Sequence, residues 1–214
     1  MTSQPELEEV VHIFDENESA DDQSLYQAID RLNVHGLNLE EPEQAKSVIK
    51  PWNLREDIGN FAQSQEDVDD QIVIHVPFVE NVHMDSLHLK LASGEFCPRR
   101  LRLYANRPHI VDFSEAEDIK PHLDIALRQD DRGVVSYPLR AGGRFANVHS
   151  ISLFFSNSAG GDSTKIFYIG FKGHSRFVKK DTSSKLDIPA ATAPDVKLYD
   201  RLQEKSGGQQ TTAR

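Results

Sequence analysis

The stretch QIVIHVPF, residues 71–78, alternates apolar side chains with other side chains. One face of this stretch carries Ile72, Ile74, Val76 and Phe78. A period of two residues is typical of a half-buried β-strand. Residues 86–91 repeat the pattern through Leu87, Leu89 and Leu91. These two segments predict two strands, each of which buries one face.

The same alternation recurs in four later segments, at residues 100–105, 134–139, 148–155 and 164–172. In the first of these, Leu101 and Leu103 face inward, whereas the outward positions are Arg100, Arg102 and Tyr104. In the last, the period places Ile166 and Tyr168 on one side and Phe167, Ile169 and Phe171 on the other. The chain therefore contains at least six candidate strands.

Clusters of Gly, Pro, Asn and Asp separate these strands, and no regular helices lie between them. This organisation predicts an all-β fold, an antiparallel β-sandwich of jelly-roll type, and disfavours a doubly wound nucleotide-binding fold. One short helix is predicted before the strands, because Ser24 can cap it and Leu25, Ile29 and Leu32 recur at helical spacing. Trp52, the only tryptophan, follows Pro51 and is expected to anchor an extended segment to the core.

A chain of 214 residues is long enough for one domain with tails. We expect an acidic flexible leader over residues 1–23, a β-sandwich domain over residues 24–197 and a disordered tail over residues 198–214. The chain is predicted to be a monomer.

The charge is unevenly distributed. Residues 1–70 carry 18 acidic and 4 basic side chains, whereas residues 71–214 carry 16 acidic and 20 basic ones. The acidic leader either aids solubility or docks against a basic face of the domain. Nucleic acid is disfavoured as a partner because the pI is about 5.3 and the basic groups are scattered.

No segment approaches the roughly 18 consecutive apolar residues of a membrane-spanning helix. Residues 1–10 are acidic where a secretory signal would be basic and then apolar. We therefore expect no membrane partner and a location in the cytosol, the nucleus or both. Cys97 is the only cysteine, which excludes an internal disulfide, a CxxC redox pair and a cysteine-rich zinc site.

Catalytic and metal-binding patterns are sparse. No serine lies in a GxSxG turn, and the diglycines at 142–143 and 160–161 lack the order of a phosphate-binding loop, so they are interpreted as turns. The acidic pairs at 69–70 and 130–131 are typical of solvated carboxylates. We expect a non-enzymatic protein without metal or cofactor. A metal-dependent enzyme built from histidines stays as the least favoured alternative, with the candidates His75, His83, His88 and His149.

The candidate partner-binding residues are four arginines, Arg99, Arg100, Arg102 and Arg107. Two of them, Arg100 and Arg102, alternate outward along one strand and would form a cationic stripe suited to carboxylates of a partner. Alternatively, these arginines bind the acidic leader of the chain itself.

The order of several segments resembles the PITH domain family. The early segments that carry the resemblance are Ser24–Asp30, Leu37–Glu40, Lys50–Trp52 and Asp69–Phe78. The later ones are Pro98 with Leu101–Asn106, Val111–Phe113, Phe145–Val148, Thr164–Ile169, Gly173 and Ala193–Lys197. The resemblance covers roughly residues 24–197, so the sandwich domain is identified as PITH-like.

The resemblance implies a galactose-binding-like β-sandwich that interacts with other proteins and has no catalytic residues. In relatives fused to thioredoxin, the module links the protein to the regulatory particle of the 26S proteasome. Because this chain lacks a CxxC motif, it resembles the stand-alone form of the family. We therefore expect a protein partner in the 26S proteasome or a similar intracellular complex. The alternative, based on fold analogy, is a β-sandwich that binds a small ligand or a carbohydrate.

Overall fold

The computed structural model describes residues 23–65, 68–128, 133–140 and 142–175. The chain divides into two compact units, Met1–Val178 and Lys179–Arg214, and every described residue belongs to the first. The predicted tail at 198–214 and nearly all of the predicted leader at 1–23 lie outside the described residues, so these boundaries stay predictions.

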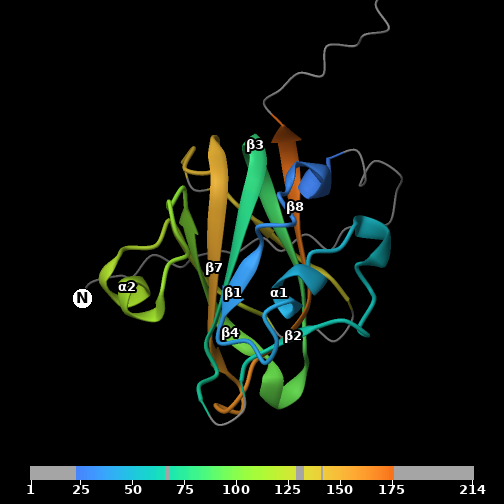
Figure 1. The fold of residues 1–214 in the computed structure, drawn as a ribbon, viewed down its shortest axis with the longest axis vertical. Helices are drawn as coiled ribbons and strands as arrows, with labels where there is room; N and C mark the ends of the chain where they lie inside the picture. The colour runs from blue at the N-terminus through green and yellow to red at the C-terminus, as the bar shows by residue number, and fades with distance from the viewer. Residues whose placement is uncertain (1–22, 66–67, 129–132, 141, 176–214) are drawn as a thin grey trace, which may run out of the picture. The chain divides into compact units, whose positions relative to one another are not determined.

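Strands dominate the described part of the chain (Figure 1). They are β1 (His35–Leu37), β2 (Ala62–Gln63), β3 (Ile72–Leu91), β4 (Pro98–Ala105), β5 (Leu123–Ala126), β6 (Val135–Pro138), β7 (Val148–Ser158) and β8 (Lys165–Ser175). The helical elements are short: η1 (Leu25–Ala28), α1 (Gln44–Ser47), η2 (Trp52–Leu54), η3 (Gly94–Phe96) and α2 (Phe113–Asp118). No helix among the described ranges has the length and apolar character required to cross a membrane.

The 20-residue strand β3 joins the two layers of the sandwich. Its first half pairs with β7 and β1, with Ile74 opposite Leu153, and the layer continues through β4 to β5. Its second half pairs with β8 and β6, with Leu87 opposite Phe171, and β2 extends this layer. All strand pairs in the described residues are antiparallel, which confirms the predicted β-sandwich.

The predicted strands at 71–78 and 86–91 are therefore one strand rather than two. The backbone stays extended across the intervening residues, and the ladder to β7 shifts register between Pro77 and Val82. A register irregularity of this kind bends and twists a strand locally. The bend lets β3 leave one layer and enter the other without a turn.

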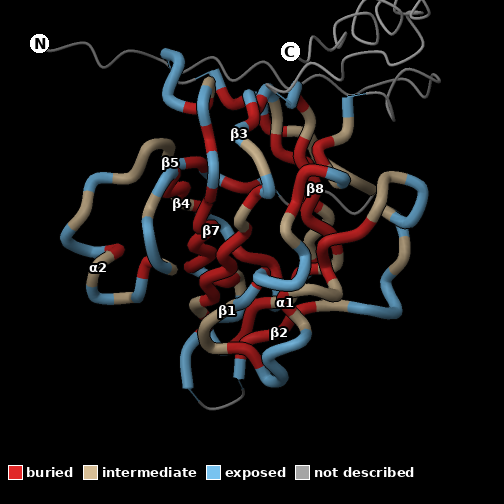
Figure 2. The backbone as a smooth tube through the Cα atoms, turned by 45° about the horizontal axis from the view of Figure 1, so that its top comes forward, coloured by how far each residue is buried: buried red, intermediate tan, exposed pale blue. Residues whose placement is uncertain are grey.

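The main core lies between the layers and contains the residues predicted to face inward. Ile72, Ile74, Val76, Leu87, Leu89, Leu101 and Leu103 all belong to one buried cluster. Figure 2 shows the buried residues concentrated along the strands and the exposed ones along the connecting loops. Burial of these side chains is the main favourable term in folding, at roughly 25 cal/mol per Å² of apolar area.

The period in β8 is broken by a register shift opposite Lys90 and Leu91. Because a shift of one residue moves side chains to the other face, the prediction is wrong for Ile166 and Phe167, whereas Tyr168 lies opposite Ile169 and Phe171 as predicted. Ile166 joins Ile169 and Phe171 in the core, whereas Tyr168 packs against Trp52 outside it.

A second, smaller buried cluster lies apart from the main core and contains Val73, Tyr104, Val111, Ala116 and Phe154. It forms on the outward positions of β3, β4 and β7 and is covered by the segment between β4 and β5, which includes α2 (Figure 1). Tyr104 points outward as predicted but is fully buried, and its hydroxyl donates to the carbonyl of Ala116 at 2.8 Å.

The predicted N-terminal helix forms but is shorter than the apolar spacing indicates. Ser24 accepts a hydrogen bond from the backbone N–H of Tyr26, as expected of a capping residue. The helix ends at Ala28, because Ile29 forms a bridge with Phe78 and Asp30 donates to the carbonyl of Pro77. Leu32 is consequently 86% exposed.

Candidate functional site

The two outward arginines of β4 are both engaged within the domain. Arg100 forms a bidentate pair with Asp124 of β5, at 3.0 Å from Nε and 2.6 Å from Nη2. Arg102 stacks over the ring of Phe154 at 4.3 Å and donates to the carbonyl of Ala116 at 2.8 Å. Arg102 therefore supports the second cluster and is only partly accessible to a partner.

The other two candidate arginines lie beyond these contacts. Arg99 is exposed at the start of β4, and Arg107 follows the end of this strand. Six residue steps of strand separate Arg99 from Ala105 by about 20 Å at roughly 3.3 Å per residue, and Arg107 lies two residues beyond the strand. The structure therefore does not bring the four arginines together as one stripe.

Arg107 lies instead near a group of cationic side chains that sequence reasoning missed. Lys120, Pro121, His122 and Arg144 line an open surface hollow of about 210 Å³, which we call the cationic hollow. These residues precede β5 and β7, so the cationic hollow lies at a loop end of the sandwich. Arg144 closes one side by donating from Nη1 to the carbonyl of His122 at 2.8 Å.

His122 is held in one orientation by three contacts. Its backbone N–H donates to the carbonyl of Leu103, and its Nδ1 accepts from the backbone N–H of Ala105 at 3.2 Å. Its ring packs near buried Phe145, with centroids 6.5 Å apart. Because Nδ1 accepts a hydrogen bond, the proton of the neutral ring is on Nε2, which is a donor.

Burial lowers the pKa of His122, and the neighbouring charges of Arg107 and Arg144 lower it further. His122 is therefore neutral near pH 7. Arg107 is thus one of the two cations whose charge acts on His122. None of Arg107, Lys120 and Arg144 forms an ion pair with a carboxylate among the described residues.

Asn106 fixes the backbone beside the cationic hollow. Its φ is 57°, a left-handed conformation that asparagine tolerates better than most residues. Its side chain donates to the carbonyl of Asn147 and accepts from the N–H of His149, each at 2.9 Å. These bonds join the loop that carries Arg107 to the start of β7, which follows Arg144.

The sequence offered only indirect signals for the cationic hollow. Gly142 and Gly143, interpreted as a turn, have φ values of 56° and 80° and immediately precede Arg144. Lys120 and His122 follow α2, which was not predicted. The three cationic or polar residues come from two separate loops, so no local spacing connects them.

The candidate histidines occupy separate structural settings. His75 is buried and its Nδ1 lies 2.9 Å from Ser152 Oγ, whereas His88 is buried under Trp52. Exposed His83 lies 3.2 Å from Asp85, which also contacts His174. Within the described ranges, no group of three or more His, Cys, Asp or Glu side chains is placed to hold a metal ion.

The acidic pair at 69–70 is partly used inside the fold. Asp70 is buried and accepts a hydrogen bond from the backbone N–H of Ser158. Burial, together with the neighbouring Asp70, raises the pKa of Asp69. The second acidic pair, at 130–131, lies outside the described residues.

Trp52 anchors its segment to the domain as predicted, but on the outer face of the second layer rather than at the core. Its ring meets His88 edge-on at 5.3 Å and lies between the charges of Arg55 at 4.5 Å and Lys172 at 4.4 Å. Such cation–π contacts stabilise a ring that is only partly buried. Trp52 therefore has a structural role in this fold.

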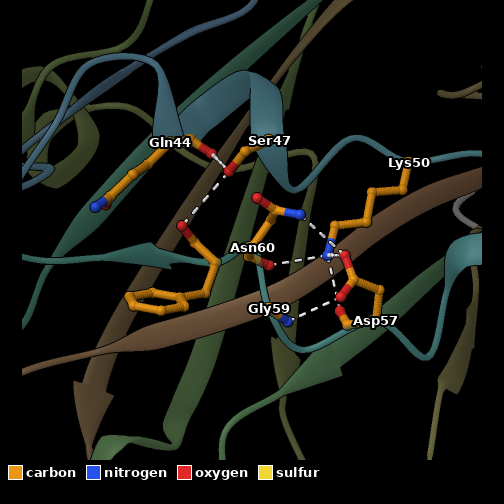
Figure 3. A network of polar contacts seen from close by, with 7 residues as sticks. Gln44, Ser47, Lys50, Asp57, Gly59 and Asn60 are labelled. Atoms are coloured by element: carbon orange, nitrogen blue, oxygen red, sulfur yellow. Dashed lines mark hydrogen bonds and ion pairs between the residues drawn. The ribbon is translucent and has the colours of Figure 1, made fainter.

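Lys50, two residues earlier, holds the same segment from inside (Figure 3). Its buried ammonium donates to the carbonyls of Asp57 and Asn60 at 2.7 and 2.8 Å and pairs with the Asp57 carboxylate at 3.1 Å. Hydrogen bonds from Gly59, Asn60 and Lys50 lower the pKa of Asp57 to about 2. The carboxylate therefore stays charged and paired at all physiological pH values.

Comparison with solved structures supports the fold. The chain resembles the CBM32-3 domain of a family 31 glycoside hydrolase from Clostridium perfringens, with a TM-score of 0.50 and 9% identity over 74% of this chain and 100% of that one. The CBM32-1 and CBM32-2 domains of ZmpB from the same organism match with a TM-score of 0.50 and 13% identity, over 73% of this chain and 38% of that one. At these identities the likeness shows the galactose-binding-like sandwich fold alone.

Comparison with protein sequences identifies the family. The PITH domain family model matches residues 15–190. A PITH domain-containing protein of Drosophila melanogaster is 35% identical over 70% of this chain and 69% of its own length. PITH domain-containing protein 1 of Homo sapiens is 32% identical over 70% of this chain and 68% of its own length. The sequence resemblance is thereby confirmed, and the chain belongs to the PITH domain family.

Proposed function

We propose that this protein is a non-enzymatic protein-interaction module that associates with the 26S proteasome regulatory particle or a similar complex in the cytosol or nucleus. The observation that carries the proposal is the cationic hollow, where Lys120 and Arg144 are exposed and form no ion pair among the described residues. Membership of a family whose curated relatives bear no enzymatic name supports it.

The physical argument rests on rigidity and charge. A sandwich holds its end loops in place, so cationic groups on them are positioned before a partner arrives. Arginine is well suited to this task because its planar guanidinium forms two parallel hydrogen bonds with one carboxylate or phosphate. A specific complex buries about 1,200–2,000 Å² in total, so the cationic hollow would be one part of a larger contact.

The direct test is capture of partners by the full chain from cell extract, at low and at physiological salt. We expect regulatory-particle subunits to be enriched, and less so when Arg107, Lys120 and Arg144 are replaced by glutamate. A charge-reversal control away from the cationic hollow is Arg31→Glu with Lys46→Glu, which changes two cationic side chains, one after η1 and one in α1. Repeated capture without any proteasome subunit would refute the proteasome assignment.

Carbohydrate or small-ligand binding is the second candidate, favoured by the placement of the cationic hollow at a loop end of a galactose-binding-like sandwich. It is tested by thermal unfolding with galactose and N-acetylgalactosamine at millimolar concentration. A ligand at 100 times its Kd stabilises a protein by about 2.7 kcal/mol. An unchanged melting temperature with every sugar would remove this candidate.

A further inference from the structure

The cationic hollow has the donor composition of an oxyanion site. Lys120 offers an ammonium with three N–H donors, and His122 in its neutral form offers Nε2–H. Arg144 uses Nη1 for the carbonyl of His122, which leaves its other guanidinium donors available. Among the described residues, neither Lys120 nor Arg144 forms an ion pair with a carboxylate, so both cationic groups are available to an anionic ligand.

Two of the three donors, His122 and Arg144, are also held before any ligand arrives. His122 is fixed by the N–H of Ala105 and by the ring of Phe145, and the bond from Arg144 joins the two loops. Asn106 ties the Arg107 loop to Asn147 and His149. A site of this kind loses little conformational entropy when an anion binds.

We propose that the cationic hollow binds a phosphomonoester carried by a protein partner, with Lys120, His122 and Arg144 as direct ligands and Arg107 as a nearby charge. This inference rests on the proposed interaction function and specifies the chemistry of the partner. A phosphomonoester carries about −1.5 to −2 charges and three acceptor oxygens, whereas a carboxylate carries one charge and two oxygens. Three separate donor side chains suit a group with three acceptor oxygens better than one with two.

The test is calorimetric titration of the full chain with three peptides that differ at one position. The parent is Glu-Asp-phosphoserine-Asp-Glu, and serine or glutamate replaces the phosphoserine in the other two. We expect the phosphopeptide to bind at least about tenfold more tightly than either comparator, which equals about 1.4 kcal/mol. Inorganic phosphate should compete with it, and the affinity should fall as salt rises.

Two single variants test the site itself. Lys120→Gln and Arg144→Gln should each weaken phosphopeptide binding about tenfold, because each removes a charged donor. Both side chains are exposed, so the variants should unfold at the same temperature as the parent. The matched control is Arg31→Gln, an exposed cation near η1, which should leave the affinity unchanged.

Three results would overturn the inference. One is equal binding of the glutamate and phosphoserine peptides, and another is full affinity in both hollow variants. The third is tighter binding of a synthetic peptide of residues 1–22, whose eight carboxylates and lack of Lys or Arg make it a carboxylate-only ligand.

The outcomes separate this inference from the proposed function. Capture of a partner complex that is insensitive to Lys120→Gln and Arg144→Gln would refute the phosphate site and leave the interaction function standing. Phosphopeptide binding without any captured complex would support the site and count against the proteasome assignment.

Discussion

At the scale of single residues, two buried histidines couple the stability of the fold to pH. Burial lowers the pKa of His75 from 6.5 to about 4, with smaller effects from His35, His149 and His109. Burial also lowers the pKa of His88 from 6.5 to about 3, with a smaller effect from Lys172. Both rings are therefore neutral in the folded protein at pH 7.

The unfolded chain binds protons at these histidines below pH 6.5, whereas the folded chain does not until about pH 4 or 3. The contribution of these two neutral histidines to stability is therefore fully present above pH 6.5. It falls as the pH decreases from 6.5 to about 4 for His75 and to about 3 for His88. The loss is at most about 1.4 kcal/mol per pH unit for each histidine. Urea unfolding at about pH 7 and about pH 5 measures it.

The comparison variant is His75→Asn with His88→Asn. It should be less stable at neutral pH but should lose less stability on acidification than the parent, because two of the proton-binding groups are gone. An equally steep loss in this variant would show that other groups dominate the acid response.

At the scale of elements, the segment between α1 and β2 is held by one lysine from inside and one tryptophan from outside. Lys50 is 6% exposed and donates hydrogen bonds to two backbone carbonyls that lie outside the strands, those of Asp57 and Asn60. Trp52 lies on the outer face of β3 and β8. Together they make a segment with little regular structure part of the folded domain.

We predict that Lys50→Met destabilises the protein by about 2–4 kcal/mol, because the carbonyls of Asp57 and Asn60 and the Asp57 carboxylate lose their buried partner. Chemical unfolding measures the change, and hydrogen exchange should show earlier opening of residues 48–61. Lys46→Met is the matched control. Its ion pair with Glu43 is on the surface and contributes less than about 1 kcal/mol. A similar effect of both variants would contradict the role of Lys50.

At the scale of the whole domain, β3 couples the two layers, because its first half belongs to the layer of β7 and its second half to the layer of β8. A cavity in either layer should therefore lower the stability of both. Leu153→Ala removes a buried side chain opposite the first half of β3, and Phe171→Ala removes one opposite the second half. Each should cost about 2–5 kcal/mol.

Hydrogen exchange of the most protected amides in β7 and β8 tests this coupling. Each variant should lower protection in both strands by a similar free energy, because the two layers open together. A variant that lowers protection in its own layer alone would show that the layers unfold independently.

Local alternation was sufficient to predict the segments that form β3, β4, β6, β7 and β8 and most of the core, but not the short strands β1, β2 and β5. Ile72, Ile74 and Val76 are buried as predicted, since each period-two pattern reflects contacts with one buried face. Trp52 could also be placed, because a large aromatic ring beside a proline gains most by packing on the domain. The resemblance to the PITH domain family then identified the type of sandwich.

The tertiary structure alone decided the remaining features. It joined two predicted strands into β3 and shifted the faces of β8, because ladder register depends on partner strands far away in sequence. It paired Arg100 with Asp124 and stacked Arg102 on Phe154, contacts within the domain that local alternation does not reveal. It also gathered Lys120, His122 and Arg144, since loops that are distant along the chain meet only when the sheets have packed.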